Sequence, residues 1–314
     1  MLDNIKSKYI MKKIFEKVNI GRQLNIIKYS KKMHDKFNKS IEDYKSYITL
    51  KEFNRNFNLN IPYNTEVLYL NEKYIRNRGL KYLSKIKLNE LNEIYLSSNK
   101  ISNLRVFEMM NLKNLNKLDL SNNEIYDINI LEKANFQELK ELNLSFNQIT
   151  DINVLSKVNF KKLTKLNLLN NRISNINILS KVNFLELKEL NLSWNEISDI
   201  SILEKVNFKD LNKLYLYNNK ISNINVLEKV NFKKLKELNL SWNEISDINV
   251  LEKVNFKELK RLNLCYNKIR DIYFLEKSIF DNLEYLNLLG NGINKEENFS
   301  IIIRLKSKIK YVSI

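Results

Sequence analysis

The sequence predicts an α/β repeat solenoid, a curved array with a parallel sheet on its concave face, preceded by a small α-helical amino-terminal module. Two observations predict this fold. The segment 187–210 recurs at 235–258 with three differences in 24 residues, and leucines open successive units at a constant spacing of 24. This period is typical of units that bury their apolar side only by stacking on one another. The nine opening residues are Leu91, Leu115, Leu139, Leu163, Leu187, Leu211, Leu235, Leu259 and Leu283.

Within each unit, the apolar spacing predicts one strand and one return turn. The shared pattern is L-x-x-L-x-L-x-x-N-x-I-x-x-I-x-x-L, followed about five residues later by Phe. Alternating leucines indicate a strand with one buried face, and the later Ile and Leu residues point inward only if the chain curls back over that strand. A diverged first unit and a truncated last strand bring the total to about eleven strands. Their markers are Leu68, Leu70 and Ile75 near Thr65, and Ile309, Val312 and Ile314.

Asparagine occupies position nine of every complete unit, counted from the opening leucine. A buried asparagine in a turn needs hydrogen-bond partners, and a neighbouring unit's backbone can supply them, so we predict a structural ladder rather than a binding site. Later in the unit, N-V-L-E (225–228, 249–252) and S-I-L-E (201–204) predict capping boxes for outer helical turns. The ladder comprises Asn99, Asn123, Asn147, Asn171, Asn195, Asn219, Asn243, Asn267 and Asn291. The back of the core is expected to hold Phe136, Phe160, Phe184, Phe208, Phe232 and Phe256.

Across roughly residues 65–314, the short unit and the phrase N-x-I-x-x-I-x-x-L resemble the leucine-rich repeat family. They are most similar to the repeats of phosphatase-regulatory proteins and bacterial internalins. The resemblance implies a curved scaffold that binds another protein on its concave face. It also implies an alternative, a regulatory subunit of a Ser/Thr phosphatase. Because members of this family share a scaffold and differ in their partners, the partner itself is not predicted.

The composition argues against catalytic, metal and cofactor sites. His34 and Cys265 are the single histidine and the single cysteine. They are too few for a zinc site, and any Ser-His-Asp or Cys-His arrangement would depend on His34 in the basic stretch KKMHDK. The four glycines form no phosphate-binding loop. We therefore predict a non-enzymatic protein with no catalytic residues, no metal, no cofactor and no small-molecule substrate.

The net charge of +17 is concentrated at the two ends of the chain. Residues 1–64 hold 14 basic and 6 acidic side chains, the segment 304–314 adds four basic ones, and 65–303 carries only +5. A single cysteine fits a reducing compartment, and no apolar run predicts a signal peptide or a membrane span. We expect a cytoplasmic protein, with the nucleus as the alternative, that is a monomer or bound to its partner.

The inner face is expected to expose positions two, three, five, seven and eight. Charges at position three alternate in sign from unit to unit, which predicts cross-strand ion pairs. The row is neutral, whereas duplex DNA would need a track of one sign, so the pattern argues against nucleic acid. This charged row consists of Glu93, Lys117, Glu141, Lys165, Glu189, Lys213, Glu237 and Arg261.

Aromatic residues gather at position eight, which reads Ser98, Asn122, Phe146, Asn170, Trp194, Asn218, Trp242, Tyr266 and Gly290. Large flat side chains on a face of Asn and Ser are typical of interface anchors. The alternative is that these rings fold over the edge of the sheet and pack on one another. With two tyrosines from positions five and seven, the predicted partner-binding residues are Phe146, Trp194, Trp242, Tyr215, Tyr217 and Tyr266.

Residues 1–64 form a separate basic module, and 65–314 form the solenoid. Apolar residues at helical spacings predict two or three short helices, either a cap for the open end of the array or an F-box-like module. The segment 7–37 resembles an F-box through Ile10, Ile14, Phe15, Leu24 and the pair Ser30-Lys31, although the usual L-P opening is missing. That resemblance implies a ubiquitin-ligase substrate adaptor. A basic patch for RNA or an acidic membrane is the third interpretation.

Overall fold

Eleven parallel strands form one open sheet, in which they follow one another in chain order. The computed structural model describes residues 41–276 and 281–314. The predicted solenoid is therefore confirmed. The strands are β1 (Val67–Tyr69), β2 (Glu93–Tyr95), β3 (Lys117–Asp119), β4 (Glu141–Asn143), β5 (Lys165–Asn167), β6 (Glu189–Asn191), β7 (Lys213–Tyr215), β8 (Glu237–Asn239), β9 (Arg261–Asn263), β10 (Tyr285–Asn287) and β11 (Tyr311–Ser313).

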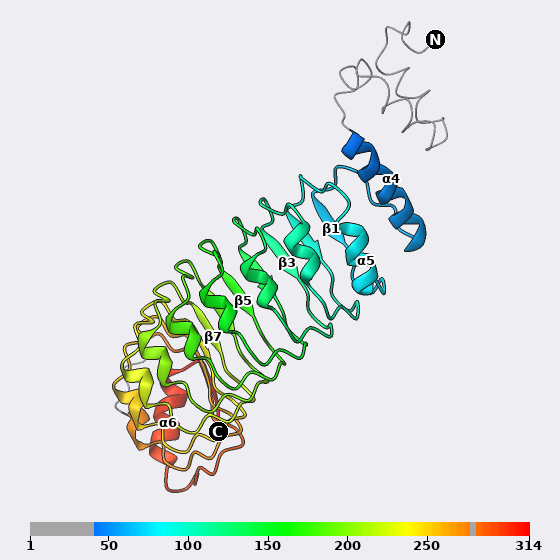
Figure 1. Ribbon diagram of the computed structural model, residues 1–314. Coiled ribbons are helices and arrows are strands. Elements are labelled where there is room, and N and C mark those ends of the chain that lie inside the picture. The colour runs from blue at the N-terminus through cyan, green and yellow to red at the C-terminus, as the bar shows by residue number, and fades with distance from the viewer. Residues whose placement is uncertain (1–40, 277–280) are drawn as a thin grey trace, which may run out of the picture.

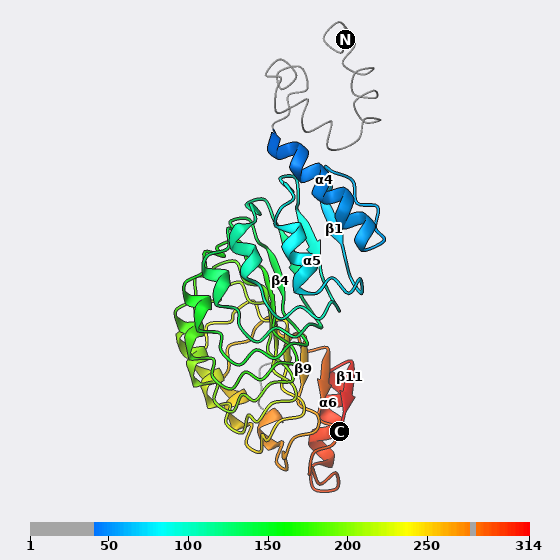
Figure 2. The same cartoon turned by 45° about the vertical axis from the view of Figure 1, so that its right-hand side comes forward.

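The return path of each unit carries a short helix on the outer side, and the array bends toward its sheet (Figures 1 and 2). An α-helix takes this place in the first and last units, as α5 (Arg76–Leu83) and α6 (Phe299–Lys308). Between them lie the 3-10 turns η2 (Arg105–Met109), η3 (Asn129–Glu132), η4 (Asn153–Ser156), η5 (Asn177–Ser180), η6 (Ser201–Lys205), η7 (Asn225–Glu228), η8 (Asn249–Glu252) and η9 (Tyr273–Glu276).

Strand register reproduces the sequence period. Leu118 lies opposite Leu142, 24 residues later. The two terminal pairings differ, since Leu68 lies opposite Ile94 and Leu286 opposite Val312, an offset of 26 residues. The longer terminal units are the ones that hold α5 and α6. All strands thus begin at the same edge of the sheet and end at the opposite edge.

The core is a continuous column of apolar side chains between the sheet and the outer turns. In the unit that opens at Leu187, every consensus Leu and Ile is at most 1 % exposed. Phe208 closes the back of the same unit. Burying one Leu, Ile or Phe side chain stabilises the folded chain by about 1.5–3 kcal/mol, so stacking of units is the main source of stability.

The asparagine ladder is present as predicted. Asn195 donates from Nδ2 to the carbonyl oxygens of Leu168 (3.0 Å), Leu192 (3.1 Å) and Ser193 (3.1 Å). Its Oδ1 accepts the N–H of Ile173 at 3.0 Å. Each such residue joins its own turn to the unit before it, which satisfies buried backbone groups that have no strand partner.

The predicted capping boxes are wrong. The turns η6, η7 and η8 begin after an isoleucine that offers no side-chain hydrogen bond. A side chain two residues before the turn instead accepts its first N–H: Asp199 accepts that of Ser201 at 2.8 Å, and Asn223 that of Asn225 at 2.8 Å. The outer turn is thus entered through an Asx turn, and the hydrogen bond from Ser201 lowers the pKa of Asp199.

Helix α4 (Ile41–Asn56) packs at the amino-terminal end of the array beside α5 (Figure 1). Leu50 and Phe53 on α4 are fully buried within the core that the repeats share. Ser46 accepts the N–H of Lys87 at 2.6 Å, and Lys87 forms an ion pair with Asp43 at 2.9 Å. Helix α4 therefore shares the apolar core of the repeats, and its role as a cap stays a prediction. The F-box-like segment 7–37 lies outside the described residues, and the boundary at residue 64 stays a prediction.

Candidate functional site

The residues at position eight share an unusual backbone conformation. Each of them has a positive φ, for example 53° at Trp194 and 52° at Asn218. Only glycine and, to a lesser degree, asparagine adopt this left-handed region readily, because a Cβ then crowds the following carbonyl. The complete set is Ser98, Asn122, Phe146, Asn170, Trp194, Asn218, Trp242, Tyr266 and Gly290.

The sequence predicted that these residues lie on the strands. In the structure they lie just beyond the carboxyl ends of the strands. Each strand spans only positions three to five. Backbone hydrogen bonds between units nevertheless continue to position eight, where Trp194 donates to the carbonyl of Tyr217 at 2.8 Å and Trp242 donates to that of Cys265 at 2.8 Å. Position eight therefore forms one ordered row along the edge of the concave sheet.

Four aromatic side chains stand exposed along this edge. The exposed fractions are 48 % for Phe146, 52 % for Trp194, 54 % for Trp242 and 43 % for Tyr266. We call these four residues the aromatic row. Trp242 and Tyr266 stack with ring centroids 4.2 Å apart. Within the described residues, Phe146 and Trp194 have no such ring partner, so mutual packing accounts for one pair only.

Gly290 is the last residue at position eight, and its φ is 72°. A Cβ at this position would lie 2.6 Å from the ring of Tyr266, so only glycine leaves room for that ring. The stacked order is thus Trp242, Tyr266 and then the bare backbone of Gly290. The ring of Tyr266 thus lies between the ring of Trp242 and the backbone of Gly290.

The two remaining candidates, Tyr215 and Tyr217, are half-buried. The hydroxyl of Tyr215 donates to Glu237 in the next unit at 2.7 Å. Burial raises the pKa of Tyr215, and the neighbouring Glu237 carboxylate raises it further. Tyr215 is therefore tied into the sheet and differs from the aromatic row in being engaged already.

The alternating charges of the charged row form the predicted ion pairs between some neighbouring strands but not between all of them. Glu141 pairs with Lys117 at 3.1 Å and with Lys165 at 3.3 Å, and Lys213 pairs with Glu237 at 3.3 Å. Burial alone would raise the pKa of Glu141, but the two ammonium groups outweigh it and hold the pKa below its usual value. The concave sheet therefore presents a polar surface on which some neighbouring charges are paired.

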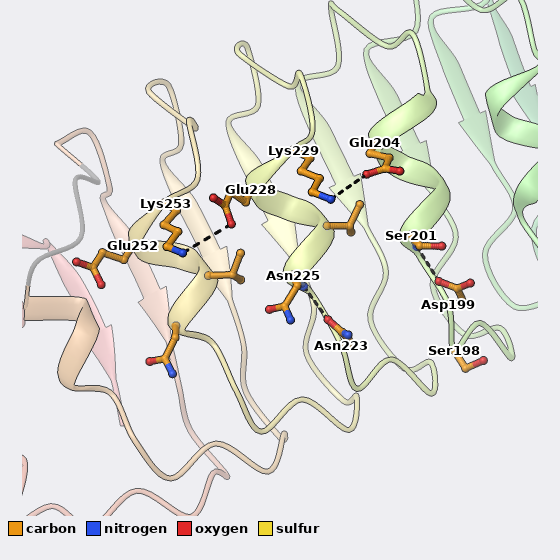
Figure 3. Close-up of a pocket in the computed structure, with 13 residues that line it drawn as sticks. Ser198, Asp199, Ser201, Glu204, Asn223, Asn225, Glu228, Lys229, Glu252 and Lys253 are labelled. Atoms are coloured by element: carbon orange, nitrogen blue, oxygen red, sulfur yellow. Dashed lines mark hydrogen bonds and ion pairs between the residues drawn. The ribbon is translucent and has the colours of Figure 1, made fainter.

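A shallow polar groove of about 820 Å³ crosses the outer face over η6, η7 and η8 (Figure 3). Its charged walls are ion pairs between neighbouring units: Glu204 with Lys229 at 3.6 Å and Glu228 with Lys253 at 4.0 Å. The same positions recur in other units, so the groove reflects the repeat. Within the described residues, no group of His, Cys, Asp and Glu could hold a metal ion. None of the helices described has the length and apolar character to cross a membrane.

Residues 137–181 match a family model described as leucine-rich repeats in two copies, and residues 187–202 and 233–248 match another described as a leucine-rich repeat. The chain carries leucine-rich repeats. No curated protein sequence matches it.

Solved structures that are similar to this chain include two internalins and one leucine-rich repeat ectodomain. An internalin (inlF) from Listeria monocytogenes is 24 % identical with a TM-score of 0.52, over 75 % of this chain and 82 % of that one. An internalin C2 from the same organism is 28 % identical over 59 % of this chain and 73 % of that one, with a TM-score of 0.46. The leucine-rich repeat ectodomain of the receptor kinase GASSHO1/SCHENGEN3 from Arabidopsis thaliana is 24 % identical over 67 % of this chain and 25 % of that one, with a TM-score of 0.51.

The sequence identified the aromatic residues but not the strain at their positions. A signal was present, since Asn and Gly share position eight with the aromatics, and a column of Asn and Gly is typical of a positive φ. In a leucine-rich repeat of this length, position eight is therefore both the exposed edge of the sheet and a conformationally demanding site.

Proposed function

We propose that this leucine-rich repeat chain is a non-enzymatic scaffold that binds another protein along the aromatic row. The observation that supports the proposal most strongly is the combination of exposure and backbone strain at Phe146, Trp194, Trp242 and Tyr266. Stacked units also form an extended surface of the kind that repeat proteins use for binding.

The strain argues for a role other than stability. A bulky residue held in the left-handed region costs about 1–3 kcal/mol, and such residues are typical of functional sites. Neighbouring units show that the same backbone conformation can be formed with a residue that tolerates it better, because Asn170 and Asn218 have φ values of 53° and 52°. Trp194, between them, adopts 53° without a ring partner among the described residues. A binding partner would explain why tryptophan occupies this position.

The chemistry of the surface favours a protein partner. Trp and Tyr are enriched among the residues that contribute most to protein–protein affinity, because they bury a large area with few rotatable bonds. The neighbouring charged row holds equal numbers of acidic and basic side chains, and some of them pair with one another. A duplex nucleic acid would leave these acidic side chains facing its phosphates. Affinity should therefore depend little on salt.

The test begins with affinity purification and mass spectrometry, followed by measured binding of the captured partner. We expect Trp194→Ala with Trp242→Ala to weaken binding by at least about 2 kcal/mol, with the fold retained. Tyr126→Ala is the control, because Tyr126 is an aromatic residue outside the row and is at least as exposed as the two tryptophans. Unchanged affinity in the double variant would refute the proposal.

The amino-terminal segment is the competing recognition site, as a ubiquitin-ligase adaptor module would require. Because α4 belongs to the core, the informative deletion removes residues 1–40 and leaves α4 in place. Loss of binding in this deletion, with strong salt dependence, would move recognition to the basic segment. A captured Ser/Thr phosphatase would instead favour the regulatory-subunit alternative.

A further inference from the structure

The two long edges of the solenoid carry opposite charge. Because all strands are parallel and in register, the loops that enter the strands lie along one edge and the loops that leave them lie along the other. The entering edge runs from position nineteen, at the end of the outer turn, to position two of the following unit. Positions ten to fifteen form the leaving edge.

Lysines dominate the entering edge. Its six loops between residues 133 and 260 contain sixteen lysines and four acidic residues, a net charge of +12. The matching loops of the leaving edge, between 124 and 249, hold two basic and seven acidic residues, a net charge of −5. All sixteen lysines are exposed, and we call them the lysine rim. They are Lys133, Lys140, Lys157, Lys161, Lys162, Lys181, Lys188, Lys205, Lys209, Lys229, Lys233, Lys234, Lys236, Lys253, Lys257 and Lys260.

Half of the lysine rim is not neutralised by a specific partner. Eight of its lysines have no ion pair with any described residue. Four of these eight occupy position 23, at Lys161, Lys209, Lys233 and Lys257. Neighbouring units are about 5 Å apart along a sheet, so the charges form a dense band that follows the edge.

Leu185 interrupts this band. It occupies position 23 in the unit between Lys161 and Lys209, and it is 50 % exposed. At the amino-terminal end of the same edge, Met109 occupies position nineteen, where the next units have lysine, and it is 73 % exposed. The edge therefore combines many exposed positive charges with two exposed apolar side chains.

We propose that the lysine rim docks this protein edge-on to an anionic lipid surface. Each clustered lysine near such a surface raises the affinity for it about fivefold, and protruding apolar side chains add a second contribution that charge alone does not supply. The aromatic row lies at the opposite edge of the sheet. A protein bound to lipid through the lysine rim would keep that row turned away from the membrane and accessible to a partner.

Residue type favours lipid over nucleic acid. The rim contains no arginine, the side chain whose planar fork suits the phosphates of a fixed backbone. It also lacks exposed aromatic residues between the lysines, which single-stranded nucleic acids use for stacking. Lysines on flexible stems suit a fluid surface whose headgroups rearrange to meet them.

Co-sedimentation of the full chain with phosphatidylcholine vesicles, with and without phosphatidylserine, tests the proposal. We expect binding only when phosphatidylserine is present, and weaker binding at higher salt. The variant Lys161→Gln, Lys209→Gln, Lys233→Gln removes three charges without breaking an ion pair. It should lower the partition coefficient on the order of a hundredfold. Leu185→Asn should cause a smaller loss that salt does not change.

The matched control removes three positive charges from outside the rim: Lys100→Gln, Arg172→Gln, Arg270→Gln. Its effect should be no more than about threefold, since exposed charges beyond a Debye length are screened. Equal losses in the two triple variants would overturn the proposal, because binding would then follow net charge alone. Failure of the unaltered chain to bind the anionic vesicles would also overturn it. Binding to polyuridine that needs the same lysines, without vesicle binding, would assign the rim to RNA.

Discussion

The Oδ1 atom of Asn195 accepts the backbone N–H of Ile173 from the preceding unit at 3.0 Å. The side-chain amide of Asn195 donates to carbonyl oxygens that other groups also contact, since Leu168 accepts from Asn171 as well. The N–H of Ile173 has no comparable second partner among the described residues. One side chain thus satisfies a buried backbone donor of its neighbour, and the relationship recurs along the array.

Asn195→Ala should therefore destabilise the protein by about 1–3 kcal/mol, the cost of leaving a buried donor unpaired. Denaturant unfolding monitored by circular dichroism measures this change. Lys188→Ala, on an exposed position of the same unit, is the control. Equal losses in the two variants would show that the ladder contributes nothing specific.

Exchange of tryptophan and asparagine at position eight should test the backbone strain. Trp194→Asn is expected to leave the free energy of unfolding unchanged or raise it by up to about 1 kcal/mol, because asparagine tolerates the left-handed region better. Asn218→Trp, at the same position one unit later, should lower it by a similar amount. Denaturant midpoints of the two variants measure both effects. A marked loss of stability in Trp194→Asn would mean that the ring is a structural element of the edge.

The ion pairs of Glu141 predict a small stabilisation that depends on pH. The folded state holds the pKa of Glu141 below its usual value, so the pairs stabilise the fold above that usual value and lose their effect as the pH falls through the folded pKa. Glu141→Gln should destabilise by less than about 1 kcal/mol at neutral pH, since the carboxylate is part-exposed. Unfolding curves across the acid range should then converge with those of the unaltered protein.

Glu189→Gln provides the comparison for that experiment, because Glu189 occupies the same position and forms no ion pair with a described residue. Its effect at neutral pH should be smaller. A difference between Glu141→Gln and the unaltered protein that persists in acid would assign the effect to packing instead of charge.

Phe53 on α4 tests whether that helix caps the array. Its side chain is fully buried against the repeats, so Phe53→Ala should destabilise by about 3–5 kcal/mol. Hydrogen exchange should show the loss first in α4 and β1, because an array of units is held by nearest-neighbour contacts. Phe299→Ala, at an exposed position on α6, should change stability by less than about 0.5 kcal/mol. If the amides of β1 stayed fully protected from hydrogen exchange in the Phe53→Ala variant, this would contradict the assignment of α4 as a cap.

Much of the fold was predictable because the repeat shows each buried position several times over. The opening leucines, the asparagine ladder and the core phenylalanines all fall where the period places them. The capping residues were not predictable in the same way. Ser201 and Glu204 have the spacing of a capping box, but the turn is 3-10 and begins at Ser201 itself, one residue earlier than a box capped by Ser201 requires. Asp199 therefore takes the capping role.

Only the structure distinguished the candidate binding residues that are exposed from those that already have partners within the sheet. The sequence indicated that Phe146, Trp194, Trp242 and Tyr266 share a position, and all four are exposed. It placed Tyr215 beside them, but that hydroxyl is already bonded to Glu237 in the next unit. Such a contact joins residues 22 positions apart, and no local pattern indicates which side chain will reach across.

The sequence by itself determined the repeat period, the buried face of each strand and the ladder, because these depend on residue spacing alone. Only the tertiary structure decided the distribution of charge. A linear count assigns residues 65–303 a charge of +5, which conceals an edge of +12 opposite an edge of −5. Along the chain, the segments that form the two edges alternate every few residues. Parallel strands in register separate them in space, because that arrangement stacks like positions of successive units at the same end of every strand.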